Sequence, residues 1–209
     1  MIHKSFPSDQ QKNTQEEPIL EHGFELFARD GVKGFTVENL AKDLVMSKKT
    51  IYKFFPTKEI LLQKIFQYLM TTLAGHFSKI RDREINPLDK FIQVMSEITR
   101  TISRIPISRV NEMKARYPAI WKDIERFRLD RRDDFFQIME EAQKQGLVRE
   151  ELDLEMAATL FMNIINTVFQ PEFFLNNQLG PKEVIEIFRD IFLRGIVTPR
   201  GLKYIEEKL

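Results

Sequence analysis

A cluster of lysines is the first feature of this sequence that indicates a possible function, the binding of phosphate groups. Between Val45 and Lys58 the chain has four lysines and no acidic residue, although the formal net charge of the whole chain is only +1. Positive charge gathered on a nearly neutral protein indicates a defined face that docks against phosphate groups. An ordinary solvent-exposed helix face can have the same composition. The secondary structure that carries the lysines therefore has to distinguish a docking face from a merely solvated one. The four residues are Lys48, Lys49, Lys53 and Lys58.

Catalytic chemistry finds little support in the residue types. The three histidines, His3, His22 and His76, are scattered along the chain, and cysteine is absent. The sequence contains no metal-binding histidine pair, nucleophile motif, phosphate-binding loop or set of carboxylates with metal-ligand spacing. We therefore expect a protein that is not an enzyme and that needs no cofactor or metal. The lack of cysteine also excludes disulfides and agrees with a cytoplasmic protein.

Membrane insertion is not expected either. The segment from Met1 to Thr14 is polar and lacks the apolar stretch of a signal peptide. Charged residues interrupt the apolar stretches of the chain well before about 18 residues, the length that a membrane-spanning helix needs. We expect the protein to have no membrane partner.

Two short helices and a tight turn are predicted to position the lysines. Thr36 can cap a helix that ends at Leu44, and Ser47 can cap a second helix from Lys48 to Phe54. Residues 45–47 form the turn between them. The second helix has apolar residues at helical spacing on one side, which leaves its lysines on the other. This is the geometry of a helix-turn-helix, whose second helix enters the major groove of DNA.

The rest of the chain also reads as helices, because no strict alternation of apolar and polar residues runs long enough to make a sheet. We predict an all-α fold of about nine helices, with a three-helix bundle that contains the helix-turn-helix, followed by a larger helical domain. The expected segments are a polar tail over 1–13, the helix-turn-helix domain over 14–57 and the larger domain over 58–209. The other expected helices run from Thr14 to Asp30, Lys58 to about Arg83, Leu88 to Arg104, Pro118 to Gln145, Asp153 to about Phe169 and Pro181 to about Gly195.

Three stretches of the N-terminal region resemble a known family. The segments FARDG (27–31) and FTVENLA (35–41) are similar to the start of TetR-type regulators. The segment SKKTIYKFFPTKEIL (47–61) is similar to their recognition helix and the start of their fourth helix. The likeness covers about residues 17 to 65, and beyond it the similarity is architectural. The sequence departs from the family pattern at Gly23, where alanine is usual, at Val45, where glycine is usual in the turn, and at Phe54, where histidine is frequent.

The resemblance implies roles for individual residues at a DNA interface. Thr36 and Tyr52 match positions that contact phosphates, and Lys58 matches a basic residue at the start of the fourth helix. Lys48, Lys49, Thr50 and Lys53 occupy positions that face the groove. Ser47 caps the recognition helix, whose backbone N–H groups can point at a phosphate. Thr36 and Ser47 would serve as helix caps in any protein, and Tyr52 could instead pack beside the core.

The resemblance also implies that the larger domain binds an effector and forms a dimer. The helix from Asp153 and the last long helix are apolar nearly all round, so something must bury them. Pairing with their symmetry mates in a four-helix bundle would do so, and a central position in a monomer is the alternative. The expected dimer residues are Phe161, Ile165, Val184, Phe188, Ile191 and Phe192.

An effector pocket would be lined by large, soft side chains with a few polar groups, as ligand sites are. An ordinary hydrophobic core has the same residue types. Residues 100–132 carry ten basic and four acidic residues, which fits an anionic effector or a solvated surface. The expected ligand-binding residues are Met95, Tyr117, Trp121, Phe127, Met139, Met162, Asn163 and Asn166.

Together these features predict a dimeric, ligand-responsive transcriptional regulator, most simply a repressor, that binds a near-palindromic operator. Its expected partners are double-stranded DNA, a small-molecule effector and a second copy of the chain. The alternative is a helical protein that binds a small molecule or a partner and keeps the N-terminal helices without binding an operator. The stretch without acidic residues around the second short helix favours DNA binding.

Overall fold

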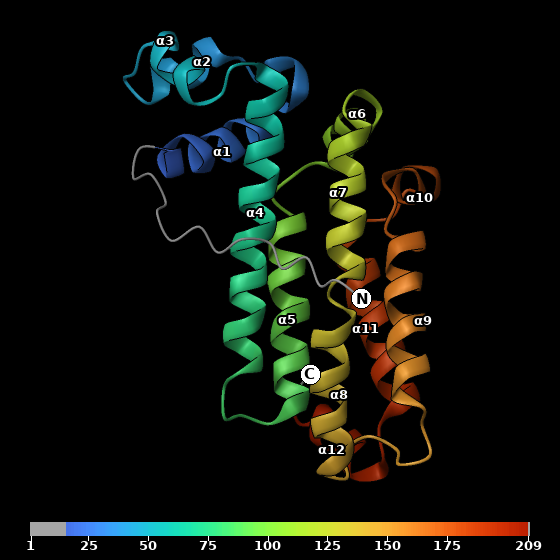
Figure 1. Cartoon of the computed structure of the whole chain (residues 1–209). Helices are drawn as coiled ribbons and strands as arrows, with labels where there is room; N and C mark the ends of the chain where they lie inside the picture. The colour runs from blue at the N-terminus through green and yellow to red at the C-terminus, as the bar shows by residue number, and fades with distance from the viewer. Residues whose placement is uncertain (1–15, 209) are drawn as a thin grey trace, which may run out of the picture. The chain divides into compact units, whose positions relative to one another are not determined.

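Figure 1 shows the computed structural model of the chain, in which residues 16–208 are described. All twelve elements within these residues are helices, and the one β-type pairing among them is an isolated antiparallel bridge between Val148 and Val197. The predicted all-α fold is confirmed. The chain divides into two compact units, residues 1–68 and 69–209. Within the described residues, no helix is both long enough and apolar enough to cross a membrane.

The N-terminal unit is built from three helices and the beginning of a fourth. Its core includes side chains of every one of these helices, among them Phe27, Leu40, Ile51 and Leu61, all fully buried. Because the first three turns of the fourth helix contribute to this core, the compact unit extends beyond residue 57 to Tyr68. The helices are α1 (Glu16–Gly34), α2 (Val37–Asp43), α3 (Lys48–Phe54) and α4 (Lys58–Arg81).

Helix α1 is broken close to its end. Gly31 has φ 69° and ψ −172°, and a further short helical segment continues to Gly34. The sequence predicted that the helix ends at this glycine. The break at Gly31 agrees with that prediction, but the helical segment that continues to Gly34 was not predicted. The predicted cap at Thr14 and the polar tail lie outside the described residues.

Gly23 explains one departure from the family pattern. A Cβ at this position would lie 2.5 Å from Cδ1 of Ile65, which is a fully buried residue of α4. The glycine therefore lets α1 and α4 approach each other closely, at a cost in helix propensity of about 1 kcal/mol relative to alanine.

The C-terminal unit holds more helices than the sequence predicted. The expected helix from Pro118 to Gln145 is two helices, interrupted at Asp130 and Arg131, and three short helices were not expected. Five of these helices begin with a proline in the first helical position, where a missing N–H costs nothing: α5, α7, α10, α11 and α12. The elements are α5 (Pro87–Ile102), α6 (Ile107–Arg116), α7 (Pro118–Leu129), α8 (Arg132–Lys144), α9 (Leu154–Val168), α10 (Pro171–Asn177), α11 (Pro181–Ile196) and α12 (Pro199–Glu206).

Phenylalanine rings form the centre of the C-terminal unit. Phe135 of α8 stacks on Phe161 of α9 with centroids 4.3 Å apart, and Phe91 of α5 packs edge-on against both. Phe188 and Phe192 extend the cluster onto α11. These contacts join four helices that are far apart in sequence, and aromatic pairs of this kind contribute beyond their buried area.

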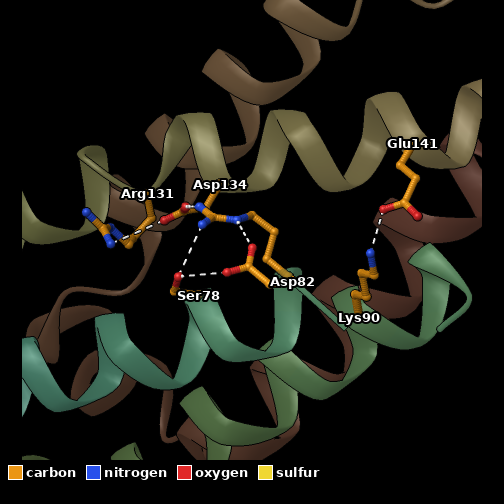
Figure 2. Close-up of polar contacts among 7 residues, drawn as sticks. Ser78, Asp82, Lys90, Arg131, Asp134 and Glu141 are labelled. Atoms are coloured by element: carbon orange, nitrogen blue, oxygen red, sulfur yellow. Dashed lines mark hydrogen bonds and ion pairs between the residues drawn. The ribbon is translucent and has the colours of Figure 1, made fainter. Parts of the chain in front are cut away.

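Ion pairs tie α4 and α5 to α8 within this unit (Figure 2). Arg81, the last residue of α4, donates to Asp134 of α8, to Ser78 on its own helix and to Asp82 directly after that helix. Asp134 also pairs with Arg131 in the interruption between α7 and α8, at 3.2 Å. The end of α4 is therefore fixed to the beginning of α8.

A second ion pair in Figure 2 is buried. The side chain of Lys90 on α5 is only 6% exposed, and its Nζ donates to Glu141 of α8 over 2.6 Å. An unpaired lysine in this position would be strongly unfavourable, so the pair fixes the register of the two helices.

The C-terminal helix α12 closes the base of the unit. Thr198 caps it, and the same hydroxyl donates to the carbonyl oxygen of Gly146 over 2.9 Å. Gly201 lies against the segment after α8, where a Cβ on this residue would overlap the carbonyl oxygen of Leu147. Tyr204 donates to Asp89 of α5 over 2.7 Å.

Candidate nucleic-acid interface

Helices α2 and α3 form the helix-turn-helix that the sequence predicts. The Thr36 hydroxyl accepts a hydrogen bond from the N–H of Asn39 at 3.1 Å, and the Ser47 hydroxyl accepts one from the N–H of Thr50 at 3.0 Å. Both are N-cap bonds, which satisfy backbone donors that the helix itself leaves unpaired. Both predicted caps and the α3 boundaries are confirmed.

The turn between the two helices contains a residue in an unfavourable conformation. Val45 has φ +53°, and its side chain is 94% exposed. A β-branched residue in the left-handed region is rare, because its side chain crowds the backbone there. Glycine, which is usual at this position in the family pattern, adopts the same conformation without that crowding.

The two sides of α3 differ as predicted. Ile51 is fully buried and Phe55 is 3% exposed, so this side of α3 packs against the core of the N-terminal unit. Lys48, Lys49 and Lys53 are exposed on the remaining surface. Tyr52 is also exposed, at 42%, and does not pack in the core. The helix therefore presents a basic outer surface with one aromatic ring.

One lysine of this surface is paired within the chain. The Nζ of Lys48 donates to Glu38 Oε1 over 2.7 Å, and both side chains are more than half exposed. The hydrogen bond lowers the pKa of Glu38 and raises that of Lys48. Sequence reasoning missed this pair, because Glu38 lies on the preceding helix, ten residues away.

Two lysines have no such partner. Lys49 and Lys53 form no hydrogen bond or ion pair with any residue of the described range 16–208. Thr50 is oriented by the cap, since its hydroxyl lies 2.8 Å from the Ser47 hydroxyl. The two lysines are therefore the charges on α3 that are available to a ligand outside the chain.

Lys58 has a structural role that the sequence did not indicate. Its Nζ donates to the carbonyl oxygen of Val32 over 3.1 Å and lies 5.7 Å from the ring centroid of Phe35. Val32 follows the break in α1, so Lys58 holds the end of α1 to the start of α4. An ammonium group has three donors, and this contact uses one of them.

The residues predicted for an effector site do not share one environment. Trp121 is only 4% exposed. Its Nε1 lies 2.9 Å from Glu125 Oε1 and 3.1 Å from Gln170 Oε1, and cations of Lys114 and Arg128 lie 5.3 and 5.1 Å from its ring centroid. Burial lowers the pKa of Arg128 to about 10. The groups around Trp121 thus satisfy one another.

The other predicted effector residues lie at different depths. Met95, Met139 and Met162 are buried in the core, whereas Tyr117, Phe127 and Asn166 are half-buried. Asn163 is exposed and donates to the carbonyl oxygen of Thr159 over 2.8 Å. The oxygen of the Asn166 side chain is buried and has no hydrogen-bond partner in residues 16–208. The expected effector residues therefore differ in exposure, and their role in binding an effector stays a prediction.

The predicted dimer residues are also divided. Phe161 is 2% exposed and lies in the aromatic cluster of its own chain, so it presents no surface to a partner. Ile165, Val184, Phe188 and Phe192 are half-buried and pack against the same core. Ile191 is 65% exposed. Further apolar side chains are exposed on the same two helices: Met156, Leu160 and Ile164 on α9, and Ile187 on α11.

This arrangement defines a helix-turn-helix protein. Residues 19–65, which include α2, the turn and α3, match the family described as bacterial regulatory proteins, tetR family. Over these residues the chain is similar to regulators of the tetR family.

Full-length relatives agree with this assignment. The HTH-type transcriptional regulator YvaF of Bacillus subtilis is 24% identical over 181 residues, which cover 86% of this chain and 94% of that protein. The HTH-type transcriptional repressor KstR2 of Mycolicibacterium smegmatis is 21% identical, with coverage of 93% and 96%. These relatives are regulators of transcription and not enzymes, in agreement with the sequence.

Solved structures share the fold. A transcriptional regulator from Cytophaga hutchinsonii has a TM-score of 0.71 at 16% identity, over 89% of this chain and 100% of that one. A TetR transcription regulator from Haloarcula marismortui has a TM-score of 0.68 at 14% identity, over 88% and 99%. The likeness extends over both units of the chain.

Proposed function

We propose that the chain acts as a homodimeric repressor, which binds a near-palindromic operator through α3 and leaves it when a small molecule binds the C-terminal unit. The observation that carries this proposal is the outer surface of α3, where Lys49 and Lys53 are exposed and have no partner among residues 16–208. A relative that is named a repressor supports the direction of control.

The interface with DNA has three kinds of contact in this proposal. Lys49 and Lys53 reach base edges or phosphates in the major groove, as exposed residues of a recognition helix do. Tyr52 and the capped start of α2 at Thr36 contact the sugar-phosphate backbone, which fixes the register of the protein. Lys58 contributes one of its two remaining donors to a phosphate while it keeps its bond to Val32.

Dimerisation would cover the apolar stripes on α9 and α11. Met156, Leu160 and Ile164 repeat every four residues on α9, and Ile187 and Ile191 do so on α11, so each set lies on one side of its helix. Exposed apolar residues that gather on one surface mark an interaction site. A second copy of the chain, placed by a two-fold axis, would present the same stripes in return.

Control by a ligand would act through α4. This helix begins at Lys58 in the N-terminal unit and ends at Arg81 in the C-terminal unit, over 24 residues or about 36 Å. Its end is held to α8 by Asp134. A ligand that prefers one position of α4 over another would shift the distance between the two recognition helices of a dimer, which a palindromic site sets at about 34–36 Å.

A binding-site selection with the purified chain and random duplex DNA tests the proposal. We expect an enriched sequence with two half-sites related by inversion. The Lys49→Ala/Lys53→Ala variant should bind that sequence about 100-fold more weakly, since good groove contacts are worth about 1–3 kcal/mol each. The matched control removes two exposed lysines of the C-terminal unit, Lys79→Ala/Lys122→Ala, and should bind normally. If no sequence is enriched, the chain is a binding protein of another kind.

A further inference from the structure

The exposed side of α9 carries polar residues within its apolar stripe. Exposed residues follow one another there at intervals of four, three and four positions, so they lie along one line of the helix. The line begins with Met156 and Leu160 and continues with Asn163 and Thr167. Residues 156–168 contain no charged side chain. The surface that the proposed dimer would bury therefore holds a carboxamide near its middle.

The carboxamide of Asn163 is only partly used within the chain. Its Nδ2 donates to the carbonyl oxygen of Thr159 over 2.8 Å, one turn earlier on the same helix. Its Oδ1 accepts no hydrogen bond from any residue of the described range 16–208. A carboxamide has two N–H donors and one acceptor oxygen, so one donor and the oxygen remain for a group outside the chain. The sequence placed Asn163 in an effector pocket, but its side chain is exposed on the outer line of α9.

The opposite side of α9 is fixed in the core of its own chain. Ala158 is fully buried, and Phe161 is 2% exposed and stacks on Phe135 of α8. Phe161 also contacts Phe188 of α11. The helix cannot turn Asn163 inward without breaking these contacts. The remaining donor and acceptor of the carboxamide are therefore left to water or to a partner molecule.

The chemistry of a carboxamide favours a second copy of the chain as that partner. In a dimer with a two-fold axis, a residue at the axis faces its own copy. Two ammonium groups or two carboxylates at that place would repel each other. A carboxamide carries both a donor and an acceptor, so it is complementary to itself. The lack of charge over residues 156–168 also means that no repulsion opposes the approach of two identical helices.

We propose that α9 crosses its copy at Asn163, and that this carboxamide forms hydrogen bonds with Asn163 of the partner subunit. The pair determines which chains can associate through this surface. An apolar residue opposite Asn163 would exclude water from the carboxamide without replacing its hydrogen bonds, which is unfavourable. The inference rests on the proposed function, because it takes the stripes of α9 and α11 as the dimer surface.

Opposite charges at position 163 test whether this residue faces its own copy. We expect Asn163→Asp and Asn163→Lys each to raise the dimer dissociation constant at least ~10-fold, because like charges then meet at the axis. An equimolar mixture of the two variants should form mixed dimers that are at least ~10-fold tighter than the dimers of either variant alone. Analytical ultracentrifugation over a concentration series measures the dissociation constants, and native mass spectrometry distinguishes mixed dimers from the others.

The matched control makes the same two changes at Asn177. This asparagine on α10 is also exposed, and its Nδ2 donates to the carbonyl oxygen of Phe173 over 2.8 Å, one turn earlier, as that of Asn163 does to Thr159. Asn177→Asp and Asn177→Lys should dimerise as the unaltered chain does, both separately and in the mixture.

Disulfide cross-linking locates the axis independently. Because the chain has no cysteine, Asn163→Cys introduces a single thiol. Oxidation of this variant should give cross-linked dimers as the main product. Met156→Cys lies seven residues away, about 10 Å along the helix, and a disulfide needs Cα atoms within about 7 Å of each other. This second variant should remain mostly without cross-links.

The outcomes separate this assignment from the proposed function. If the unaltered chain is a dimer but the mixture of Asn163→Asp and Asn163→Lys restores no association, or Asn163→Cys does not cross-link, the assignment of Asn163 to the axis fails alone. A monomeric unaltered chain overturns the assignment together with the proposed dimer. Restored association in the mixture, in a chain that selects no operator, would support the assignment and reject the regulator proposal.

Discussion

The Nζ of Lys48 lies 2.7 Å from Oε1 of Glu38, so the first residue of α3 is paired with the second residue of α2. The pair keeps one of the three lysines of α3 from acting on DNA with its full charge. Glu38→Gln removes the carboxylate and frees Lys48 for a phosphate. We expect this variant to bind duplex DNA of any sequence more tightly, with a salt dependence steeper by about one unit.

Fluorescence anisotropy over a range of salt concentrations measures both quantities. Glu207→Gln, at the exposed C-terminal end of the described chain, is a control with the same change in net charge. Equal slopes for Glu38→Gln and the unaltered chain would show that Lys48 stays away from phosphates even when it is free.

Val45→Gly should stabilise the protein. A residue of this type at φ +53° costs roughly 1–2 kcal/mol, and glycine adopts the same conformation without that cost. Glycine also gains freedom in the unfolded chain, so the net effect should be close to 1 kcal/mol. Because the Val45 side chain is 94% exposed, no buried contact is lost.

Urea unfolding followed by circular dichroism gives the free energy of unfolding for this variant. Val45→Ala removes the branched side chain but keeps a Cβ, so it should recover only part of the gain. Unchanged stability in Val45→Gly would mean that the turn carries no strain.

Ile191→Glu should separate the proposed dimer. The side chain lies on the exposed stripe of α11, where a partner would bury it, and a buried charge without a partner costs several kcal/mol. Analytical ultracentrifugation should report monomers for this variant and dimers for the unaltered chain. Leu129→Glu changes an apolar residue of similar character that is 40% exposed on α7, and it should remain dimeric. A dimeric Ile191→Glu protein would place the interface elsewhere.

Tyr204 should make stability fall at alkaline pH. Burial, together with the hydrogen bond to Asp89, raises the pKa of Tyr204 from 10.0 to about 12. Between these values the folded chain keeps the proton that the unfolded chain has lost, so rising pH favours the unfolded state. The contribution is fully present below pH 10 and is lost as the pH approaches 12.

The matching variant is Tyr204→Phe. Its free energy of unfolding should be lower near neutral pH by about 1 kcal/mol, the usual value of one hydrogen bond, and should fall less steeply above about pH 10. Parallel pH profiles for the two proteins would exclude Tyr204 as a source of this dependence.

The local features of the DNA-binding unit were predictable from the sequence, because their causes lie within a few residues of each other. Thr36 and Ser47 cap the helices that follow them directly, and the unusual residue at Val45 indicated its strained turn. The bond from Lys58 to Val32 was not predictable. It depends on a break in α1 that brings together residues 26 positions apart.

Helical periodicity alone also fails where a helix is apolar nearly all round. On α9, Phe161 and Leu160 are neighbours of similar character, yet the first is 2% exposed and the second 55%. Which of them faces inward depends on the phenylalanine cluster contributed by three other helices.

The close approach at Gly201 limits which sequences this fold can have. Because a Cβ there would overlap the carbonyl oxygen of Leu147, the obstacle is backbone and cannot turn aside as a side chain would. At Gly75 and Gly195 a Cβ would meet nothing within 4 Å. Among homologues, or in a library of random variants, position 201 should therefore stay glycine while those two positions drift to alanine and larger residues.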